Sequence, residues 1–490
     1  MAARKTRNPR VLFVTPEIYP LIKTGGLADV GGALPAALRE LGVDIKVLVP
    51  GYPKVLAGAK NIRQRCVFHD LPEAKVVRLL SASLPGSGVP LLIVDCPPLY
   101  QRGGGPYQDP SGADWPDNAR RFALLSRIGA LLGGEASPLT FRPDIVHCND
   151  WQSALAPAFL RFMPGKKAAT VMTIHNLAFQ GIFPPQVFDQ TGLPPESFNM
   201  EGAEYYGNFS FLKAGLYYAD HITTVSPTYA REIQDEPLGF GMQGLLAQRS
   251  ARLTGIVNGI DANDWNPAAD PHLARNYAAA DLAGKAADKR ALQERLGLAP
   301  DPDIPLLGII SRITHQKGQD LLLEIAPRLL DKPVQIALLG TGEAELENGF
   351  RRLIQAYPGK VGALIGFDEG LSHLMEAGAD LFLMPSRFEP CGLNQMYSQR
   401  YGTPPVVHAT GGLADTVVDA NPATLADASA SGFVFAPPTA EAFYACIGRA
   451  LDAYHDKDIW NRIQRNGMTR DFSWQKSAED YLALYKSLFQ

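Results

Sequence analysis

The residues best suited to chemistry lie in the segment 385–396, which reads PSRFEPCGLNQM. An apolar run at 381–384, typical of a buried strand, precedes this segment, and its two prolines end the run. After Gly392, the residues from Leu393 to Tyr401 have helix-forming character. A strand that turns into a helix N-terminus leaves backbone N–H groups without partners, and the helix dipole adds positive potential there. The segment therefore predicts a site for an anion such as a diphosphate.

One carboxylate, that of Glu389, stands just before the predicted helix. A carboxylate repels phosphate, so neutral hydroxyl groups, such as those of a sugar, are its more natural partners. The simpler alternative is an ordinary strand-to-helix loop with a solvated glutamate, because short loop motifs also match by chance.

Composition limits the class of protein and its partners. The 490 residues exceed what one hydrophobic core usually supports, so we expect two or more domains. The net charge of −4 gives no general attraction to nucleic acid or to an anionic membrane surface, and we expect neither as a partner. Five scattered cysteines without a CxxC pair fit reduced thiols in the cytoplasm and argue against a zinc site. No run resembles a secretory signal or is long enough to cross a bilayer.

Strand-like and helical stretches alternate through the first half of the chain. Helical character is strongest at 118–132 and 153–161, and strands are expected at 11–14, 45–49, 90–94, 144–147, 169–174 and 221–225. This alternation predicts a parallel sheet with helices on both faces, whose ligands bind at the carboxyl ends of the strands. Polar residues cluster at those predicted ends, namely Asp150, His175 and Asn176. Tyr107 lies in a glycine-rich loop that we expect to be mobile.

The first predicted strand leads into the motif KTGGL at 23–27. Two adjacent glycines, Gly25 and Gly26, allow a ligand to approach the backbone, and Lys23 adds a mobile cation. The motif is neither a dinucleotide fingerprint nor a P-loop, and a flexible surface turn is the alternative. The longer hexapeptide TGGLAD occurs at 24–29 and again at 410–415, and we interpret both copies as ligand-facing loops.

A second alternation follows a polar connector that runs from about residue 266 to about residue 303. Strands are expected at 306–310, 334–339, 361–365, 380–384 and 405–408. We therefore expect two α/β domains of the same type, residues 1–257 and 258–490, facing each other across a deep cleft. The last helix is expected to pack back on the first domain.

Loops of the second half add phosphate-binding character. Arg312 and Lys317 are two cations five positions apart on one loop, which suits a diphosphate, although a cluster of solvated bases is the alternative. Gly342 lies in a weak phosphate-loop motif. Phe367 follows a predicted strand, where its ring can stack on a base, and core packing is its simpler interpretation.

In this order and spacing, the motifs resemble those of bacterial glycogen synthases, the ADP-glucose-using relatives of plant starch synthases. The resemblance covers nearly the whole chain and rests on KTGGL at 23–27, Arg312 with Lys317, EPCGL at 389–393 and TGGLAD at 410–415. It implies two Rossmann-like domains in the GT-B glycosyltransferase arrangement. It also implies transfer of glucose from ADP-glucose to the non-reducing end of an α-1,4-glucan, such as glycogen or a maltooligosaccharide, with retention of the anomeric configuration.

The resemblance also implies roles for individual residues. The residues expected at the reaction centre are Arg312 and Lys317 on the leaving diphosphate, Glu389 on glucose hydroxyls and His175 beside the transferred sugar. Donor binding is expected from Lys23, Gly25, Gly26, Asn258, Gly342, Phe367, Cys391, Gly392, Leu393 and Asn394. The acceptor or sugar side is expected at Asp29, Tyr107, Asp150 and Asn176. No metal or other cofactor is expected, because arginine, lysine and a helix N-terminus supply the positive charge.

The chain departs from the pattern of related transferases at three positions. Tyr397 stands where many of them have a second glutamate for the nucleotide ribose, and Asn394 and Phe367 replace a threonine and a tyrosine that family members often have. A double displacement would need a carboxylate nucleophile at the anomeric carbon. The sequence offers no obvious one, so we favour same-face attack without a covalent intermediate.

Two other functions remain open at this stage. One is a retaining transferase of the same architecture that uses UDP-glucose or a small acceptor. The other is a non-catalytic protein that binds a nucleotide or a glucan. The combination of Lys23, Arg312, Lys317 and Glu389 argues against the second alternative, because simple binding would not require all four.

Overall fold

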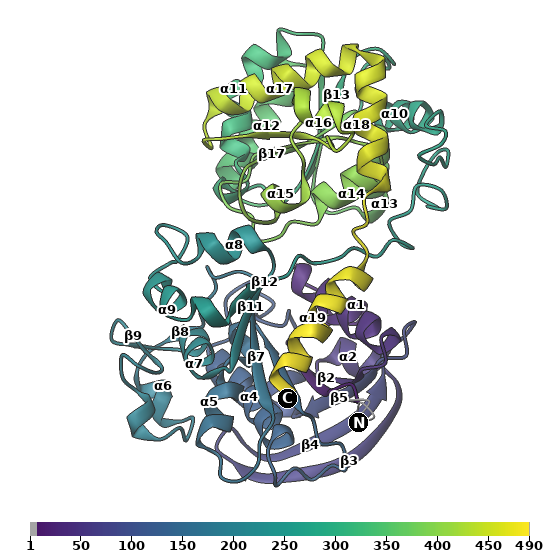
Figure 1. Ribbon diagram of the computed structural model, residues 1–490. Helices are drawn as coiled ribbons and strands as arrows, with labels where there is room; N and C mark the ends of the chain where they lie inside the picture. Colours follow the sequence, from purple (N-terminus) through teal and green to yellow (C-terminus); the bar gives the residue numbers. More distant parts are fainter. Residues whose placement is uncertain (1–6, 490) are drawn as a thin grey trace. The chain divides into compact units, whose positions relative to one another are not determined.

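The computed structural model describes residues 7–489, which divide into two compact units (Figure 1). Unit 1 comprises Met1–Val225, Ala230–Asn258 and Trp474–Gln490, and unit 2 comprises Ser226–Tyr229 and Gly259–Ser473. The division thus lies one residue later than the sequence indicated, and the short segment Ser226–Tyr229 is grouped with unit 2. Across residues 7–489, no helix combines the length and the apolar character needed to span a membrane.

Unit 1 is built on a nine-stranded sheet in the order β12-β11-β7-β6-β1-β2-β5-β4-β3. Strands from β12 to β5 pair in parallel, and β4 and β3 add an antiparallel edge. The inner strands are apolar runs buried on both faces, as a sheet covered by helices requires. The bounds are β1 Arg10–Val14, β2 Asp44–Pro50, β3 Lys60–Leu71, β4 Ala74–Ser83, β5 Pro90–Asp95, β6 Ile145–Asn149, β7 Ala169–Ile174, β11 His221–Thr224 and β12 Leu253–Gly255.

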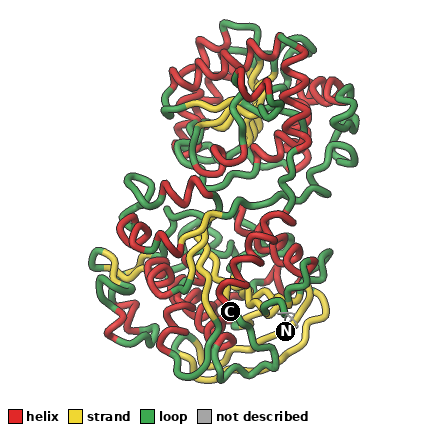
Figure 2. Tube along the Cα trace, viewed as in Figure 1, coloured by secondary structure: helices red, strands yellow, loops and turns green. Residues whose placement is uncertain are grey.

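Helices cover both faces of this sheet (Figure 2). The helices of unit 1 are α1 Gly26–Glu40, α2 Pro53–Gly58, α3 Pro97–Tyr100, α4 Asn118–Gly133, α5 Leu155–Phe162, α6 Gln186–Asp189, α7 Phe211–Tyr218, α9 Gln243–Gln248 and α19 Trp474–Phe489. A further helix, α8 Pro227–Glu232, begins in the segment that is grouped with unit 2. A separate small antiparallel sheet contains β8 Ile182–Phe183, β10 Asn208–Ser210 and β9 Glu204–Tyr205. Neither this sheet nor the β3–β4 hairpin was predicted from the sequence.

The last helix, α19, belongs to unit 1 and lies beside α1 (Figure 1). Its Ser477 hydroxyl donates to the carbonyl oxygen of Val257 at 2.6 Å. Deeper in the unit, the hydroxyl of Tyr485 is hydrogen-bonded to Nδ1 of His147 on β6 at 2.6 Å. Burial lowers the pKa of His147 to about 3, so this imidazole is neutral near pH 7. The helix is therefore attached through a polar contact inside the core as well as by apolar packing.

Unit 2 contains a six-stranded parallel sheet in the order β15-β14-β13-β16-β17-β18. Numbered within the unit, this is the 3-2-1-4-5-6 order of doubly wound nucleotide-binding sheets. The strands are β13 Leu306–Ile310, β14 Gln335–Gly340, β15 Val361–Ile365, β16 Leu381–Met384, β17 Pro405–His408 and β18 Phe433–Phe435. The helices are α10 Gly284–Arg295, α11 Gln319–Leu330, α12 Ala344–Ala356, α13 Glu369–Gly378, α14 Asn394–Arg400, α15 Gly411–Thr416, α16 Pro422–Ala426, α17 Ala440–His455 and α18 Lys457–Thr469. The prediction of two Rossmann-like domains is confirmed.

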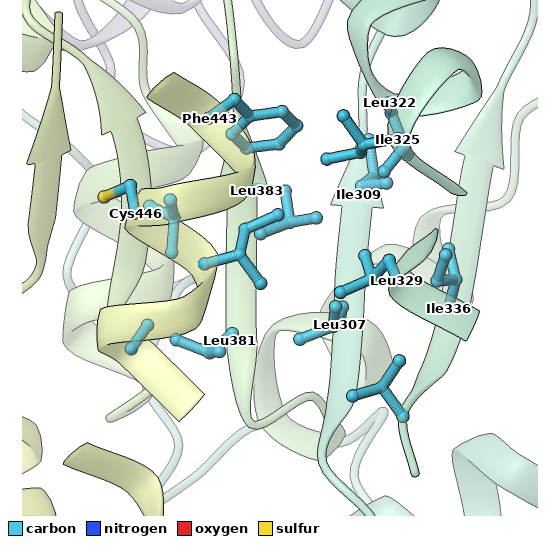
Figure 3. Close-up of a cluster of buried hydrophobic side chains, with 14 of the residues drawn as sticks. Leu307, Ile309, Leu322, Ile325, Leu329, Ile336, Leu381, Leu383, Phe443 and Cys446 are labelled. Atoms are coloured by element: carbon cyan, nitrogen blue, oxygen red, sulfur yellow. The ribbon is translucent and has the colours of Figure 1, made fainter. Parts of the chain in front are cut away.

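The core of unit 2 shows how the sheet is held in place. Figure 3 shows leucine and isoleucine side chains of β13, β14 and β16 pointing toward Leu322, Ile325 and Leu329 on α11 and toward Phe443 and Cys446 on α17. All of these side chains are at most 2% exposed. A close-packed core of this kind fixes the strands rigidly, so the loops at their carboxyl ends start from defined positions.

Candidate active site

The central strands of the unit 2 sheet, β13 and β16, are neighbours whose following helices lead to opposite halves of the sheet. Ligands of doubly wound sheets bind at such a switch point, outside the carboxyl ends of the strands. The loop after β13 carries Lys317 and the loop after β16 carries Glu389, and these two residues form an ion pair across 72 positions of sequence. The fold thus brings together two of the predicted catalytic residues.

Glu389 is buried, with 7% of its surface exposed. Its Oε2 accepts hydrogen bonds from Nζ of Lys317 and from the hydroxyl of Ser386, the latter at 3.1 Å. The interpretation of Glu389 as a solvated loop residue is therefore wrong. Because little water reaches this pair, either charge would lose a strong interaction if the other moved away. A ligand that attracts Lys317 must therefore offer Glu389 new donors, and sugar hydroxyls are such donors.

The turn from Glu389 into α14 presents backbone donors, as the sequence predicted. Gly392 has a φ of +72°, in the left-handed region that favours glycine. Within residues 7–489, the N–H groups of Gly392 and Leu393 donate to no protein atom. The side-chain amide of Asn394 donates to the carbonyl oxygen of Ile310 at 2.7 Å, which attaches the turn to the end of β13. Cys391 is buried beneath the turn.

The second TGGLAD copy supports this turn from behind and does not face a ligand through its glycines. Gly411 and Gly412 are both buried, and the N–H of Gly412 donates to the carbonyl oxygen of Glu389 at 3.2 Å. A Cβ at Gly411 would lie 1.9 Å from that same oxygen, and one at Gly412 would lie 2.1 Å from the carbonyl oxygen of Cys391. Our interpretation of this copy as a ligand-facing loop is corrected: its glycines let two protein backbones approach each other.

Three other predicted residues of unit 2 have different degrees of access. Arg312 is exposed, and its Nη2 donates to Oε1 of Gln316 at 3.3 Å. The N–H of Gly342 donates to Oε1 of Glu347 at 2.8 Å, so a ligand must displace this carboxylate to reach that amide. Phe367 is 81% exposed, and the core-packing interpretation of its ring is wrong. An exposed ring at this edge remains free to stack on a flat ligand.

At the corresponding switch point of unit 1, between β1 and β6, a residue that we had not predicted organises two loops. Glu17 is 2% exposed, and its carboxylate accepts from the N–H of Thr24 at 2.5 Å and from the Thr24 hydroxyl at 2.6 Å. The hydroxyl of Tyr107 donates to the same carboxylate. Burial and the neighbouring Glu17 raise the pKa of Tyr107 well above its ordinary value, so its phenol remains a donor.

The loop around Tyr107 is held at several points, contrary to our expectation of a mobile loop. The N–H of Gly105 donates to the carbonyl oxygen of Gln108 at 2.8 Å. The carbonyl oxygen of Tyr107 accepts from the N–H of Trp115 at 3.0 Å and from the side-chain amide of Asn118 at 2.9 Å. Together with the bond to Glu17, these contacts fix the phenol beside the KTGGL motif.

The KTGGL motif itself is open. Nζ of Lys23 lies 2.8 Å from Oδ1 of Asp29, and the lysine side chain is 49% exposed. Gly25 is extended, with a φ of −162°, and a Cβ at this position would meet no atom within 4 Å. Gly26 is exposed and begins α1. This segment therefore offers a cation and the N-terminus of a 15-residue helix to a ligand.

The polar residues after β6 and β7 form a connected group. Oδ1 of Asp150 accepts from the N–H of His175 at 2.7 Å, and the N–H of Asn176 also donates to this carboxylate. Nε2 of His175 lies 2.9 Å from Oδ1 of Asn149. Since an amide oxygen accepts, Nε2 carries the proton and Nδ1 is left as an acceptor. Asn149 is a second member of the site that we had not predicted.

Burial shifts the pKa values of this group in opposite directions. It lowers the pKa of His175 to about 3, so the imidazole is neutral near pH 7. It raises the pKa of Asp150 to about 7, although the backbone donors of His175 and Asn176 oppose that rise. A neutral imidazole beside a carboxyl group that is partly protonated at pH 7 can bind sugar hydroxyls through hydrogen bonds and adds little net charge.

Asn258, the last predicted donor-binding residue, ends unit 1 and is 8% exposed. Its Oδ1 is buried and accepts no hydrogen bond from any group within residues 7–489. A buried amide oxygen without a donor is uncommon and marks a place where a ligand or a water molecule can bind. Over the same residues, no group of three or more histidine, cysteine, aspartate or glutamate side chains is arranged to hold a metal ion.

Comparison with known proteins assigns both halves of the chain to families. Residues 10–248 match the starch synthase catalytic domain, and residues 292–467 match the glycosyl transferases group 1. Among curated proteins, the chain is similar to the glycogen synthase of Nitrosomonas eutropha, with 61% identity over 487 residues that cover 99% of this chain and 97% of the relative. It is also 60% identical to the glycogen synthase of Nitrosospira multiformis over 481 residues, which cover 98% of this chain and 97% of that protein.

Solved structures agree with this assignment. The catalytic domain of starch synthase IV from Arabidopsis thaliana, bound to ADP and acarbose, has a TM-score of 0.87 and 31% identity over 98% of this chain and 99% of that chain. Sucrose-phosphate synthase from Thermosynechococcus elongatus, at 18% identity and a TM-score of 0.60, shares the fold over 98% of this chain and 99% of its own. With relatives of this identity over nearly its full length, the chain belongs to the glycogen synthase family of glycosyltransferases.

Proposed function

We propose that this enzyme transfers glucose from ADP-glucose to the non-reducing end of an α-1,4-glucan, with retention of the anomeric configuration. The observation that carries the proposal is the Lys317–Glu389 pair beside the free N–H groups of Gly392 and Leu393 at the switch point of unit 2. A cation, a carboxylate and open amides together match a ligand that combines a diphosphate with a sugar. The related starch synthase, whose solved structure is bound to ADP and acarbose, supports this choice of donor and acceptor.

In the proposed reaction, the positive groups of unit 2 stabilise the leaving diphosphate. Negative charge grows on the diphosphate as the glycosidic bond breaks, and preorganised donors stabilise such charge more strongly in the transition state than in the ground state. Lys317 and the N–H groups of Gly392 and Leu393 are held in place by the loops described above, and Arg312 supplies a second cation. Glu389 then exchanges its bond from Lys317 for bonds from glucose hydroxyls.

In unit 1, Lys23 and the N–H groups at Gly25 and Gly26 are proposed to contact the donor. His175, which is neutral near pH 7, is proposed to contact the transferred sugar, and Asp150 holds its backbone. Tyr107, Asp29 and Asn176 are assigned to the acceptor or sugar side. These assignments rest on the family resemblance, and they are supported by the placement of Asp150, His175 and Asn176 just after the carboxyl ends of β6 and β7.

Retention is proposed to proceed by same-face attack without a covalent enzyme intermediate. Glu389, a carboxylate of this site, is engaged by Lys317 and Ser386 and is assigned to sugar hydroxyls, so it is not proposed as a nucleophile. We further propose that the reaction needs no metal, because the lysine, the arginine and the backbone amides provide the charge. A cytoplasmic location is proposed on the basis of the five free cysteines, which suit a reducing compartment.

A donor test decides between this function and its alternatives. We expect incorporation of radiolabelled glucose from ADP-glucose into glycogen, at a rate well above that from UDP-glucose, and without loss when EDTA is present. A higher rate with UDP-glucose would favour the alternative of a UDP-glucose-dependent transferase. Absence of transfer from both donors, with binding of ADP or glycogen retained, would favour a non-catalytic protein. NMR of the product should show only α-linkages, and a β-linkage would contradict retention.

A further inference from the structure

A cavity of about 420 Å³ lies in unit 1, at the opposite end of the sheet from the candidate active site. Lys46 near the start of β2, Leu91 near the start of β5 and Phe141 before β6 line this cavity. These residues lie at or before the amino ends of strands. The unit 1 residues that we assign to substrate lie in segments that follow the carboxyl ends of strands. The β3–β4 hairpin, at the edge of the sheet in Figure 1, provides the remaining wall. The volume is within the range of about 300–1,000 Å³ typical of small-molecule sites.

Strand pairing places two cations on one face of the sheet. Arg63 on β3 pairs with Ser81 on β4, and Ser81 pairs with Leu92 on β5. Leu92 pairs with Leu48 on β2, which lies two residues from Lys46. Residues that are directly opposite, or two apart on a strand, project from the same face. Arg63 and Lys46 therefore project from the same face of the sheet, although β4 and β5 lie between their strands, β3 and β2.

Two irregularities in β3 bring further polar groups to the cavity. The pairing shifts between Lys60 and Arg63 and again between Gln64 and Cys66. Bulges of this kind redirect side chains. Arg65 lies within the second shift, lines the same cavity as Arg63 and donates through Nε to the hydroxyl of Ser81 at 2.7 Å.

The lining contains three cations, Lys46, Arg63 and Arg65, and no carboxylate. Over residues 7–489, none of the three forms an ion pair with an acidic side chain. Charged residues on an edge strand often serve only to prevent pairing with other chains, and this explains the exposure of the two arginines. It does not explain Lys46, which is on an interior strand with its Nζ 4.6 Å from the ring centre of Phe141. This half-buried lysine lies beside two arginines in a cavity without carboxylates, and the local positive charge favours an anionic ligand.

We propose that this cavity binds a phosphomonoester of a small ring compound. Arg63, Arg65 and Lys46 bind the phosphate, and the ring lies against Phe141 and against Leu92, which projects from the same face of the sheet as the cations. Guanidinium groups bind phosphate through paired N–H donors, and the leucine and phenylalanine walls suit either a sugar ring or an aromatic ring. The phosphate is the shared chemistry, and the nature of the ring is for experiment to decide.

Isothermal titration calorimetry of the full chain tests the proposal with two probes, ribose 5-phosphate and phenyl phosphate. Ribose and phenol serve as their uncharged counterparts. We expect saturable binding of at least one phosphate, affinity that falls as salt rises, and no binding of either uncharged compound. Binding of ribose 5-phosphate alone supports the site with a sugar phosphate as ligand, and binding of phenyl phosphate alone supports it with an aromatic phosphate. Absence of binding by both at millimolar concentration overturns the proposal.

Variants then locate the binding. The double variant Arg63→Gln/Arg65→Gln and the single variant Lys46→Met, which keeps an apolar stem over Phe141, should each bind at least about tenfold more weakly. Lys75→Gln, which removes an exposed cation from the same hairpin outside the cavity, should bind within about twofold of the unmodified protein. Unchanged circular dichroism and an unchanged rate of glucose transfer verify the fold of each variant. Equal affinity in the unmodified protein and the double variant would place the phosphate elsewhere and refute the proposal.

Discussion

The hexapeptide TGGLAD occurs once in each unit, and its two copies have opposite environments. In unit 1, Gly25 is exposed and extended, with open space where a side chain would begin. In unit 2, Gly411 and Gly412 are buried against the backbone of Glu389 and Cys391. Both copies begin a helix, so the local structure is similar and only the surroundings differ.

The two copies show that a glycine pair can serve two purposes. In unit 1 the missing side chain of Gly25 leaves open space, which we propose that a ligand occupies. In unit 2 the missing side chains leave room for the loop that carries Glu389, so the motif supports the site from within. The final aspartates differ in the same way. Asp29 pairs with the half-exposed Lys23, whereas Asp415 accepts from the N–H and the hydroxyl of Thr228 at 2.9 and 2.6 Å.

The largest effect should come from adding a methyl group to the second copy. Gly412→Ala places a Cβ about 2 Å from a backbone carbonyl oxygen that cannot move alone. Overpacking against backbone should cost about 3 kcal/mol, which lowers the unfolding midpoint of unit 2 by roughly 6–12 °C. Differential scanning calorimetry measures this shift, with Gly25→Ala as the matched control. Equal unfolding midpoints for Gly412→Ala and Gly25→Ala would contradict the difference that we infer between the two glycine pairs.

The next effect concerns the residue that the second copy supports. Glu389→Gln preserves shape but removes charge-assisted hydrogen bonds worth about 1.5–3 kcal/mol, so turnover should fall roughly tenfold to a hundredfold. The dissociation constant for ADP should change little, because other groups bind the nucleotide. Steady-state rates and ADP titration measure the two quantities. Glu324→Gln, at an exposed carboxylate on α11, is the control and should keep full turnover. Normal turnover of a folded Glu389→Gln protein would remove this residue from the site.

A smaller effect is expected from filling the open copy. Gly25→Val introduces a branched side chain that the extended backbone accepts, so the unfolding midpoint should shift by less than about 2 °C. The same side chain should obstruct a ligand at the start of α1 and lower turnover by about tenfold, or about 1.4 kcal/mol. Calorimetry and rate assays on one preparation separate the two effects. Loss of stability without loss of turnover would reverse the roles that we assign to the two copies.

The smallest difference should appear at the aspartates. Asp415→Ala removes two hydrogen bonds at the start of a helix and should cost about 1 kcal/mol, or roughly 2–4 °C in the midpoint of unfolding. Asp29→Ala breaks an exposed ion pair, which contributes at most about 0.5 kcal/mol. Calorimetry of both variants in the same buffer sharpens the comparison. If Asp29→Ala proves the more destabilising, the first copy has a structural role that its exposure does not indicate.

The buried strands were predictable because both of their faces are covered by helices. Such strands appear in the sequence as continuous apolar runs, and the predicted ranges 169–174, 306–310 and 405–408 coincide with β7, β13 and β17. β3 was missed because its first six residues are all exposed and provide no apolar period. A strand that is stabilised by pairing with its neighbour, and not by burial of its side chains, leaves a weak signal in a single sequence.

The site was predictable only in part. Lys317 and Glu389 could each be placed at a strand end, but their pairing depends on the adjacency of β13 and β16 in the sheet. Glu17 was missed because its partner Tyr107 lies 90 residues away, and no local pattern connects the two. The burial of Gly411 and the exposure of Phe367 likewise depend on packing between distant segments. Spacing identifies a loop as polar or flexible, whereas tertiary packing decides what the loop contacts.

The return of α19 to unit 1 has a consequence for biosynthesis. Tyr485 and His147 are 338 residues apart, and the whole of Gly259–Ser473 lies between α19 and the rest of unit 1. A ribosome must therefore release all of unit 2 before the first unit can bury His147. Until then, nascent unit 1 exposes the surface that α19 later covers. It therefore depends on chaperones, or on rapid completion of the chain, to avoid aggregation. A pause in translation within unit 2 should prolong that vulnerable period.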